Sequence, residues 1–234
     1  MFAGRKKALL IVAAAVLALI MICWPLYLPE IRSEEKEEQI ELPEIAVEDE
    51  LTELIYNRQS QREFADTPLS RDDVGRLLWA GEGITVDGVA GPTRSSPSAG
   101  ATNPLELYLL ASDVEGLTPG IYHYSTRDHE LTLQAEGSRG GELAAAALGQ
   151  PAAGEAPAVV IIAARYERTT GRYGERGLQY VQMESGHAAQ NISLMAESEG
   201  MGSVIIGAFH DDEVRNIITT EQAEPLLIIP VGYQ

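Results

Sequence analysis

Two kinds of residue are scarce in this sequence of 234 residues: it has one cysteine, Cys23, and 17 basic residues against 35 acidic ones. A lone cysteine excludes a disulfide framework and any paired-cysteine metal or redox motif. The net charge of −18 argues against nucleic acid as a partner, because binding to a phosphate backbone needs clustered cations. After residue 53 the sequence contains no lysine, so every permanent positive charge there is an arginine, whose planar guanidinium suits phosphate and carboxylate groups.

The N-terminal part contains a long run, residues 8–28, that carries no charge. A helix of that length crosses a bilayer core of about 30 Å. Basic residues at positions 5–7 precede the run, and the positive-inside rule therefore places the N-terminus in the cytoplasm and the rest of the chain outside. The run ends in the bulky segment 23–27 instead of a small-residue cleavage site, so residues 1–29 are predicted to be an uncleaved, single-pass membrane anchor.

The next segment, residues 30–53, holds eleven acidic residues and two basic ones. Like charges repel one another, which predicts a solvated linker. Residues 54–234 form the predicted globular domain, in which apolar segments with helical spacing alternate with short apolar runs.

The expected elements of this domain follow from periodicity and from turn residues. Helices are predicted for residues 51–59, 71–80, 142–148, 176–199 and 211–218. Strands are predicted for residues 105–111, 120–124, 130–134, 158–164, 204–209 and 226–231. Ser70 with Asp73 predicts a helix N-cap, Asp211 or Asp212 predicts another, and the composition of residues 81–100 predicts a loop. Strands interleaved with helices predict an α+β or α/β sandwich around one sheet.

Three segments carry residue types that suit ligand binding. In the first, Arg58 and Arg62 are four residues apart and flank Ser60. Two guanidinium groups at that spacing can close on one phosphate, with the hydroxyl as a further donor, although arginines so spaced are also common on ordinary surfaces. The second segment, residues 95–104, combines small residues that let a flat ligand approach the backbone with hydroxyl and amide groups; an ordinary polar loop is the alternative.

The third segment is glycine-rich and covers residues 200–209. Gly200 and Gly202 are expected to end the long helix. Gly207 interrupts a strand pattern, which indicates a bulge or the close approach of another group.

Taken in order, these segments resemble the nitroreductase superfamily of flavin mononucleotide (FMN) enzymes over residues 54–233. The resemblance is closest to the SagB/ThcOx-type branch, the azoline dehydrogenases of peptide-modifying clusters. It rests on Pro97–Tyr108, Arg172–Gly177, Tyr180, Glu184, Gly186, His187, Gln190, Asn191, Gly200–Phe209 and Pro230–Tyr233.

The resemblance implies an α/β/α sandwich with a mixed central sheet, in a homodimer that holds FMN at the subunit interface. It implies these cofactor-binding residues: Arg58, Ser60, Arg62, Pro97, Ser98, Ala99, Asn103, Gly202, Ser203, Val204 and Gly207. The two arginines would grip the phosphate and the pyrimidine edge, with Ser60 assisting, residues 97–99 would line the ring, and Asn103 would reach ribityl or ring oxygens. Residues 202–207 would pass backbone amides along the ring. Glu184, Gln190 and Asn191 are implied at the dimer interface or in support of the site.

The sequence departs from the family pattern in two ways. No basic residue follows Arg215, so phosphate binding would rest on the first two arginines and on one of Arg165, Arg168, Arg172 or Arg176. The catalytic lysine–tyrosine pair of azoline dehydrogenases is absent, because the domain has no lysine; candidates for part of its role are Tyr122, Tyr124, Tyr166, Tyr173 and Tyr180. The catalytic residue is therefore left open, and no metal site is expected, because no histidine pair has ligand spacing.

The sequence as a whole predicts a membrane-anchored, FMN-dependent oxidoreductase. It would transfer hydride between a donor, such as NAD(P)H, and an unidentified small-molecule or peptide substrate. The alternatives are a non-catalytic tethered flavin-binding or interaction module, a reductive dehalogenase and a peptide azoline dehydrogenase. FMN and NAD(P)H are scarce outside the cytoplasm, so the opposite orientation of the anchor also stays open.

Overall fold

The computed structural model describes residues 40–88 and 91–234. Residues 40–46 are exposed and contain no helix or strand, whereas Val47–Gln234 form a compact unit. In the described part of the chain no helix is both long enough and apolar enough to span a membrane. The anchor predicted for residues 1–29 lies outside the described residues.

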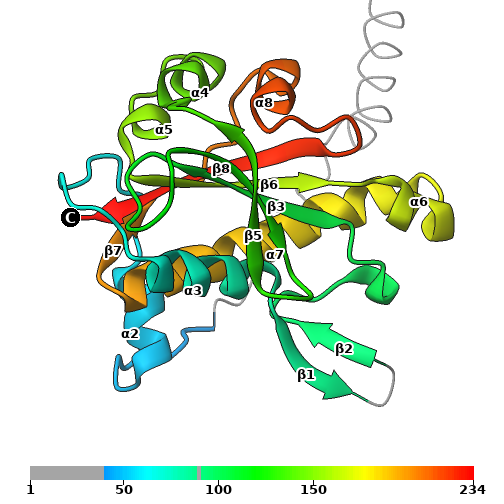
Figure 1. The fold of residues 1–234 in the computed structure, drawn as a ribbon. Coiled ribbons are helices and arrows are strands. Elements are labelled where there is room, and N and C mark those ends of the chain that lie inside the picture. The colour runs from blue at the N-terminus through cyan, green and yellow to red at the C-terminus, as the bar shows by residue number, and fades with distance from the viewer. Residues whose placement is uncertain (1–39, 89–90) are drawn as a thin grey trace, which may run out of the picture. The chain divides into compact units, whose positions relative to one another are not determined.

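A six-stranded sheet forms the centre of the compact unit, in the order β5-β4-β3-β6-β8-β7 (Figure 1). Its strands are β3 (Leu105–Ala111), β4 (Gly120–Ser125), β5 (Glu130–Glu136), β6 (Ala158–Ala164), β7 (Met201–Ser203) and β8 (Glu224–Tyr233). Each neighbouring pair is antiparallel, so the predicted mixed sheet is wrong for these strands. Strands β6 and β7 run in the same direction, but β8 lies between them and is antiparallel to both. Parallel pairing at this sheet edge is reduced to an isolated bridge between Ser60 and Ser203.

Helices cover both faces of the sheet, which confirms the predicted α/β/α sandwich. They are α2 (Glu50–Asn57), α3 (Arg71–Glu82), α4 (Gly140–Ala146), α5 (Ala152–Glu155), α6 (Glu167–Tyr173), α7 (Arg176–Ser198) and α8 (Asp211–Ile217). Figure 1 shows α3 and α7 on one side of the sheet and α4, α5 and α8 on the other. Each side has its own apolar cluster, represented by Leu77 and Ile192 on the first face and by Leu143 and Val214 on the second.

The best-predicted elements are those whose signal is local. Strand β6 is a continuous apolar run, and all seven of its residues are buried, as expected for a strand covered on both faces. Burial of each aliphatic side chain, such as that of Ile161, contributes about 1.5–3 kcal/mol. The start of α3 is a capping box, in which the Ser70 hydroxyl accepts from the Asp73 amide at 3.1 Å and the Asp73 carboxylate accepts from the Ser70 amide at 2.7 Å.

Four features differ from the sequence-based expectations. The predicted loop 81–100 contains an antiparallel hairpin of β1 (Ile84–Gly88) and β2 (Gly91–Arg94). The predicted strand 204–209 is displaced to β7, because beyond Ser203 only Ile206 pairs with β8, through an isolated bridge. The N-cap of α8 is His210 and not an aspartate, and its side chain makes no capping hydrogen bond. Helices α5 and α6 were not predicted at all.

Candidate functional site

The first and third predicted segments meet at the edge of the sheet formed by β7. Ser60 forms a parallel bridge with Ser203, and the Gln61 amide donates to the Ser203 carbonyl at 2.9 Å. Gly202 permits this approach, because a Cβ on it would lie 2.7 Å from the Cβ of Gln61. The glycine that the sequence assigned to a helix end therefore serves the contact between two chain segments.

The two arginines of the first segment lie beside this edge. Arg58 is the C-cap residue of α2 and is half-buried, whereas Arg62 and Ser60 are exposed. Among the ion pairs of the described residues, none involves Arg58 or Arg62. Two uncommitted guanidinium groups and a hydroxyl form a donor set that suits a dianionic phosphate.

The chain beyond β7 is more open than predicted. Ser203 and Val204 are buried, and Gly207 is exposed. If Gly207 carried a Cβ, the nearest described atom would be on the side chain of Leu227, 3.8 Å away. The close approach expected at this glycine is thus not made by any described protein group, and its backbone remains accessible.

The second segment is a tightly bonded turn that contains a short 3₁₀ helix, η2 (Ala99–Ala101). The Ser98 hydroxyl accepts from the Asn103 amide at 2.9 Å. From α6, the Arg172 guanidinium donates to the Gly100 carbonyl at 2.8 Å, and the Arg168 guanidinium donates to the Asn103 carbonyl at 2.9 Å. Helix α6 therefore fixes the turn from one side.

The backbone of this turn is strained. Gly100, Ala101 and Asn103 have φ angles of 58°, 55° and 44°, in the left-handed region. Non-glycine residues in that region cost about 1–3 kcal/mol each, and such strain is frequent where a ligand is held. The Asn103 side-chain amide donates to the Ala101 carbonyl at 3.2 Å, so it is turned toward its own loop. Pro97 is exposed, and Ser98 and Ala99 are half-buried.

Five tyrosines were candidates for part of the catalytic role. Of these, Tyr173 lies against the turn: its hydroxyl is so close to Gly100 that a Cβ there would clash with it. The Tyr173 ring packs edge-on to that of Tyr180, with centroids 5.2 Å apart. The guanidinium of Arg172 lies 5.4 Å from the centre of the Tyr173 ring. The remaining three lie elsewhere in the chain: Tyr122 and Tyr124 on β4, and Tyr166 at the start of α6.

Helix α7 contacts residues 95–99 through two side chains, Glu184 and Asn191. Glu184 is 2% exposed, and its Oε2 accepts from the Ala99 amide at 3.4 Å. Its Oε1 has no hydrogen-bond partner within the described chain, and burial raises the pKa of this carboxyl. Asn191 donates to the Ser95 carbonyl at 3.0 Å, whereas Gln190 is exposed. Two of the three α7 residues implied by the resemblance therefore contact this segment.

A second buried carboxyl, which sequence reasoning missed, lies at the root of the β1–β2 hairpin. Glu82 is 2% exposed, and its Oε1 accepts from the Ser96 hydroxyl at 2.7 Å. The Arg94 Nε lies 4.0 Å from Oε2. Burial raises the pKa of Glu82 to about 7, against the opposing effects of Ser96 and Arg94, and Glu184 raises it further. A glutamate at a helix end gives no signal of burial in the sequence.

Two of the four arginines considered as additional phosphate ligands, Arg165 and Arg168, are engaged with a third carboxylate. Glu106 on β3 contacts Arg165 at 3.3 Å and Arg168 at 2.5 Å. The ring Nε2 of His123 lies 2.7 Å from the other oxygen of Glu106. Arg176 also has a partner, because it donates to the side chain of Gln179.

The strained turn and the arginine group lie beside different stretches of α7, although Asn191, which contacts Ser95, is only seven residues before Ser198. Glu184, which contacts the strained turn, is 14 residues before Ser198, at the end of the helix. At 1.5 Å per residue, this separation is about 20 Å. Strand β7, with the arginine group beside it, follows that end directly. Among the hydrogen bonds and ion pairs of the described residues, none joins Arg58, Ser60 or Arg62 to residues 97–103.

A family model described as the nitroreductase family matches residues 55–233. The chain is 44% identical over 194 residues to MJ1384 of Methanocaldococcus jannaschii, a protein with a provisional nitroreductase name, covering 83% of this chain and 96% of that one. It is 26% identical over 133 residues to the trifolitoxin-processing protein TfxB of Rhizobium leguminosarum bv. trifolii. That match covers 55% of this chain and 36% of TfxB.

Solved structures agree with the family assignment. A structure from Anabaena variabilis, provisionally described as a nitroreductase, superposes with a TM-score of 0.68 at 25% identity, covering 78% of this chain and 38% of the other. The microcin synthetase McbBCD complex of E. coli, with truncated pro-MccB17 bound, has the same fold, with a TM-score of 0.64 at 22% identity and coverage of 89% and 83%. The resemblance inferred from the motifs is confirmed: the chain is a member of the nitroreductase family of oxidoreductases.

Proposed function

We propose that the chain is an FMN-dependent oxidoreductase whose cofactor sites are each assembled from two copies. The observation that carries this proposal is the separation of the arginine group from the strained turn by about 20 Å along α7. A two-fold axis that crosses α7 would place the turn of one copy next to the arginine group of the other. An isologous pairing of this kind creates two equivalent sites from two incomplete ones.

The side chains that are present fit FMN. Arg58 and Arg62, which have no ion-pair partner among the described residues, would hold the phosphate together with the hydroxyl of Ser60. The exposed backbone at Gly207 and the small residues 97–99 would lie against the ring, with Gly202, Ser203 and Val204 beside them. When bound, the flavin supplies the two-electron redox chemistry, and the protein supplies binding, orientation and electrostatics.

The chain's own proton-handling group in this proposal is Tyr173. Its hydroxyl lies at the turn beside Gly100, and the Arg172 guanidinium lies over its ring. Tyr173 would therefore exchange a proton with a substrate bound at the turn. Glu184 and Asn191 would act indirectly, by holding the backbone of residues 95–99 in place.

The donor, the substrate and the membrane anchor belong to the same proposal. NAD(P)H or another carrier would deliver electrons, and a small molecule or a peptide would accept or supply them. The anchor in residues 1–29 would tether the domain by a single span, with the domain on the outer side of the membrane; this part rests on the sequence alone.

The proposal is tested by reconstituting the full-length chain with excess FMN and measuring retained flavin after gel filtration. The double variant Arg58→Gln/Arg62→Gln is expected to bind FMN at least about tenfold more weakly, because each lost charged hydrogen bond is worth about 1.5–3 kcal/mol. The exposed Arg127→Gln is the matched control and should bind normally. A wild-type chain that retains no flavin contradicts the proposal. Bleaching of the flavin band by NAD(P)H separates an enzyme from a non-catalytic module.

A further inference from the structure

A cavity of about 380 Å³ lies between α3 and the β4–β5 hairpin, and neither group of the proposed flavin site lines it. One stripe of α3 faces it, whereas Arg76 on another side of the helix pairs with Glu199 at the end of α7, at 3.1 Å. The volume lies near the lower end of the range for small-molecule sites, which is about 300–1,000 Å³. The lining residues are Arg71, Val74, Gly75, Leu78, Leu117, Tyr124, His129, Glu130 and Leu131.

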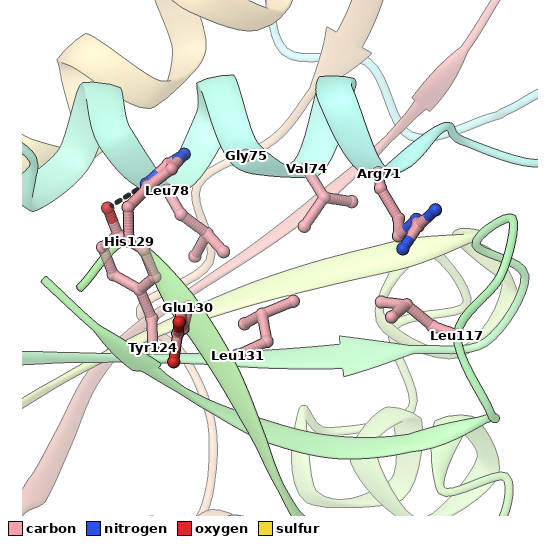
Figure 2. A pocket seen from close by; sticks show the side chains of 9 residues that line it. All are labelled: Arg71, Val74, Gly75, Leu78, Leu117, Tyr124, His129, Glu130 and Leu131. Carbon is pink, nitrogen blue, oxygen red and sulfur yellow. Dashed lines mark hydrogen bonds between the residues drawn. The ribbon is translucent and has the colours of Figure 1, made fainter.

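The middle of this pocket is apolar. Figure 2 shows Val74 and Leu78 on the helix facing Leu131 on the hairpin, with Leu117 near one end. Val74 and Leu78 belong to the buried core, so the floor of the pocket is fixed by packing. A rigid apolar floor favours a compact apolar ligand body.

One end of the pocket is cationic. Arg71 reaches this end in Figure 2 and passes beside a turn, where a Cβ on Gly116 would lie 3.4 Å from its Nε. None of the ion pairs between described residues involves Arg71, although Asp72 and Glu115 share a neighbouring hollow with it. Its guanidinium is therefore available to a carboxylate.

The other end carries a hydrogen-bonding pair. The Tyr124 hydroxyl and the His129 Nδ1 lie 2.8 Å apart, and Figure 2 shows this contact closing the end of the pocket. Burial raises the pKa of Tyr124 to about 12, so the phenol keeps a proton that it can donate to Nδ1. When Nδ1 accepts from the phenol, a ring proton is on Nε2, which faces α3 at Gly75, 3.5 Å from where a Cβ would be. His129 thus offers an N–H donor to the pocket.

We propose that this pocket binds a small monocarboxylate with an apolar body and a neutral hydrogen-bond acceptor at its far end. The carboxylate would bind Arg71, the body would pack on Val74 and Leu78, and the acceptor would bind His129 Nε2. Arg71 and Gly75 are one helical turn apart, about 6 Å along the axis, which sets the scale of the ligand. Glu130 at the rim disfavours a second negative charge near His129, so dicarboxylates are excluded.

The test uses the full-length chain and four probes of similar size: 4-acetylbenzoate, its uncharged analogue 4-acetylbenzamide, 4-isopropylbenzoate, which lacks the acceptor, and the dicarboxylate terephthalate. Affinities are measured by ligand-observed NMR titration against wild type, Arg71→Gln and the exposed control Arg127→Gln. Arg71 is exposed and has no ion-pair partner within the described residues, so its variant should fold normally. FMN retention of each variant is measured in parallel, and we expect it to be unchanged.

Wild type should bind 4-acetylbenzoate at least about fivefold more tightly than the other three probes, with dissociation constants in the millimolar range typical of fragments. Arg71→Gln should abolish the preference over the amide, while Arg127→Gln should keep it. Equal binding of acid and amide to wild type overturns the proposal, as does an acid affinity that Arg71→Gln leaves unchanged. A second variant, Gly75→Val, places a side chain in the pocket and should weaken all four probes; undiminished binding to it also overturns the proposal.

Discussion

Replacement of Glu82 by glutamine should remove a large pH dependence from the stability of the domain. Glu82 is 2% exposed, and burial raises its pKa from 4.5 to about 7 in the folded chain. In the unfolded chain, the carboxyl returns to its ordinary pKa. Between these two values, the folded state binds more protons than the unfolded state, so the unfolding free energy falls as the pH rises.

The size of the effect follows from the two pKa values. A difference in pKa from 4.5 to about 7 corresponds to about 3 kcal/mol of unfolding free energy. This free energy is lost progressively as the pH rises between the two pKa values, and the loss is complete above the higher one. Glutamine at position 82 is neutral and can still accept the hydrogen bond from Ser96. As the pH rises from 4.5 to 8, the unfolding free energy of the variant should therefore increase by about 3 kcal/mol relative to that of wild type.

Urea unfolding followed by circular dichroism, at half-unit steps from pH 4.5 to pH 8, measures this difference. The matched control is Glu136→Gln, at an exposed position at the end of β5. The control should track wild type at every pH, whereas Glu82→Gln should diverge from it as the pH rises. If Glu82→Gln and wild type give parallel curves, the carboxyl is not buried with a raised pKa and the account of the hairpin root is wrong.

Two other substitutions test the contact of β7 with Gln61 and the ion pairs of Glu106 on β3. Gly202→Ala should lower the unfolding free energy by about 1–3 kcal/mol, because the added methyl group would lie 2.7 Å from the Cβ of Gln61. The control Gly141→Ala has open space around it and should be close to neutral or stabilising. Equal melting temperatures for the two variants would contradict the close packing of Gly202 on Gln61. Glu106→Gln should destabilise by about 1–3 kcal/mol, because Arg168 and Arg165 lose a shared carboxylate; unchanged urea midpoints would show that this pairing is marginal.

The parts of the fold that could be predicted are those that depend on neighbouring residues. The apolar run of β6 and the Ser70–Asp73 cap of α3 both carry their information locally. Both appear in the structure within a few residues of the predicted bounds. The family and its motif residues were also recognisable, because several short motifs occur in the right order over most of the domain.

The missed features depend on contacts that are distant in sequence or that local composition hides. The β1–β2 hairpin contains glycine and proline, which predict a loop, yet the hydroxyls of Thr85 and Thr93 join its strands at 3.0 Å. The apolar run 204–209 was predicted to be a strand, but within it only Ile206 forms a β-bridge with β8, and Val204 adds a single hydrogen bond to the Pro230 carbonyl. The surroundings of Glu82 include α7, which lies about a hundred residues later in the sequence: Ile192 packs beside the neighbouring Gly81, and the charge of Glu184 raises the pKa of Glu82.

The candidate site was predictable in its residue types and not in its layout. The family resemblance assigned the arginines, the serines and the glycines to one ligand, but the sequence does not say beside which part of α7 each segment lies. The length of α7 separates the turn from the arginine group by about 20 Å. The ion pairs of Arg165 and Arg168 with Glu106 could not be predicted either, because they join residues that are about 60 positions apart in the sequence.

The most direct test of the shared site is complementation between two defective chains. Arg58→Gln/Arg62→Gln removes the phosphate donors, and Gly100→Val disrupts the turn, where a Cβ would lie 2.7 Å from Arg172 Nη1. The two variants are co-expressed with different tags, and the heterodimer is isolated and reconstituted with FMN. We predict that each homodimer retains essentially no flavin, whereas the heterodimer, with one intact site, retains about one flavin per two chains. A heterodimer as empty as its parents would contradict the shared site.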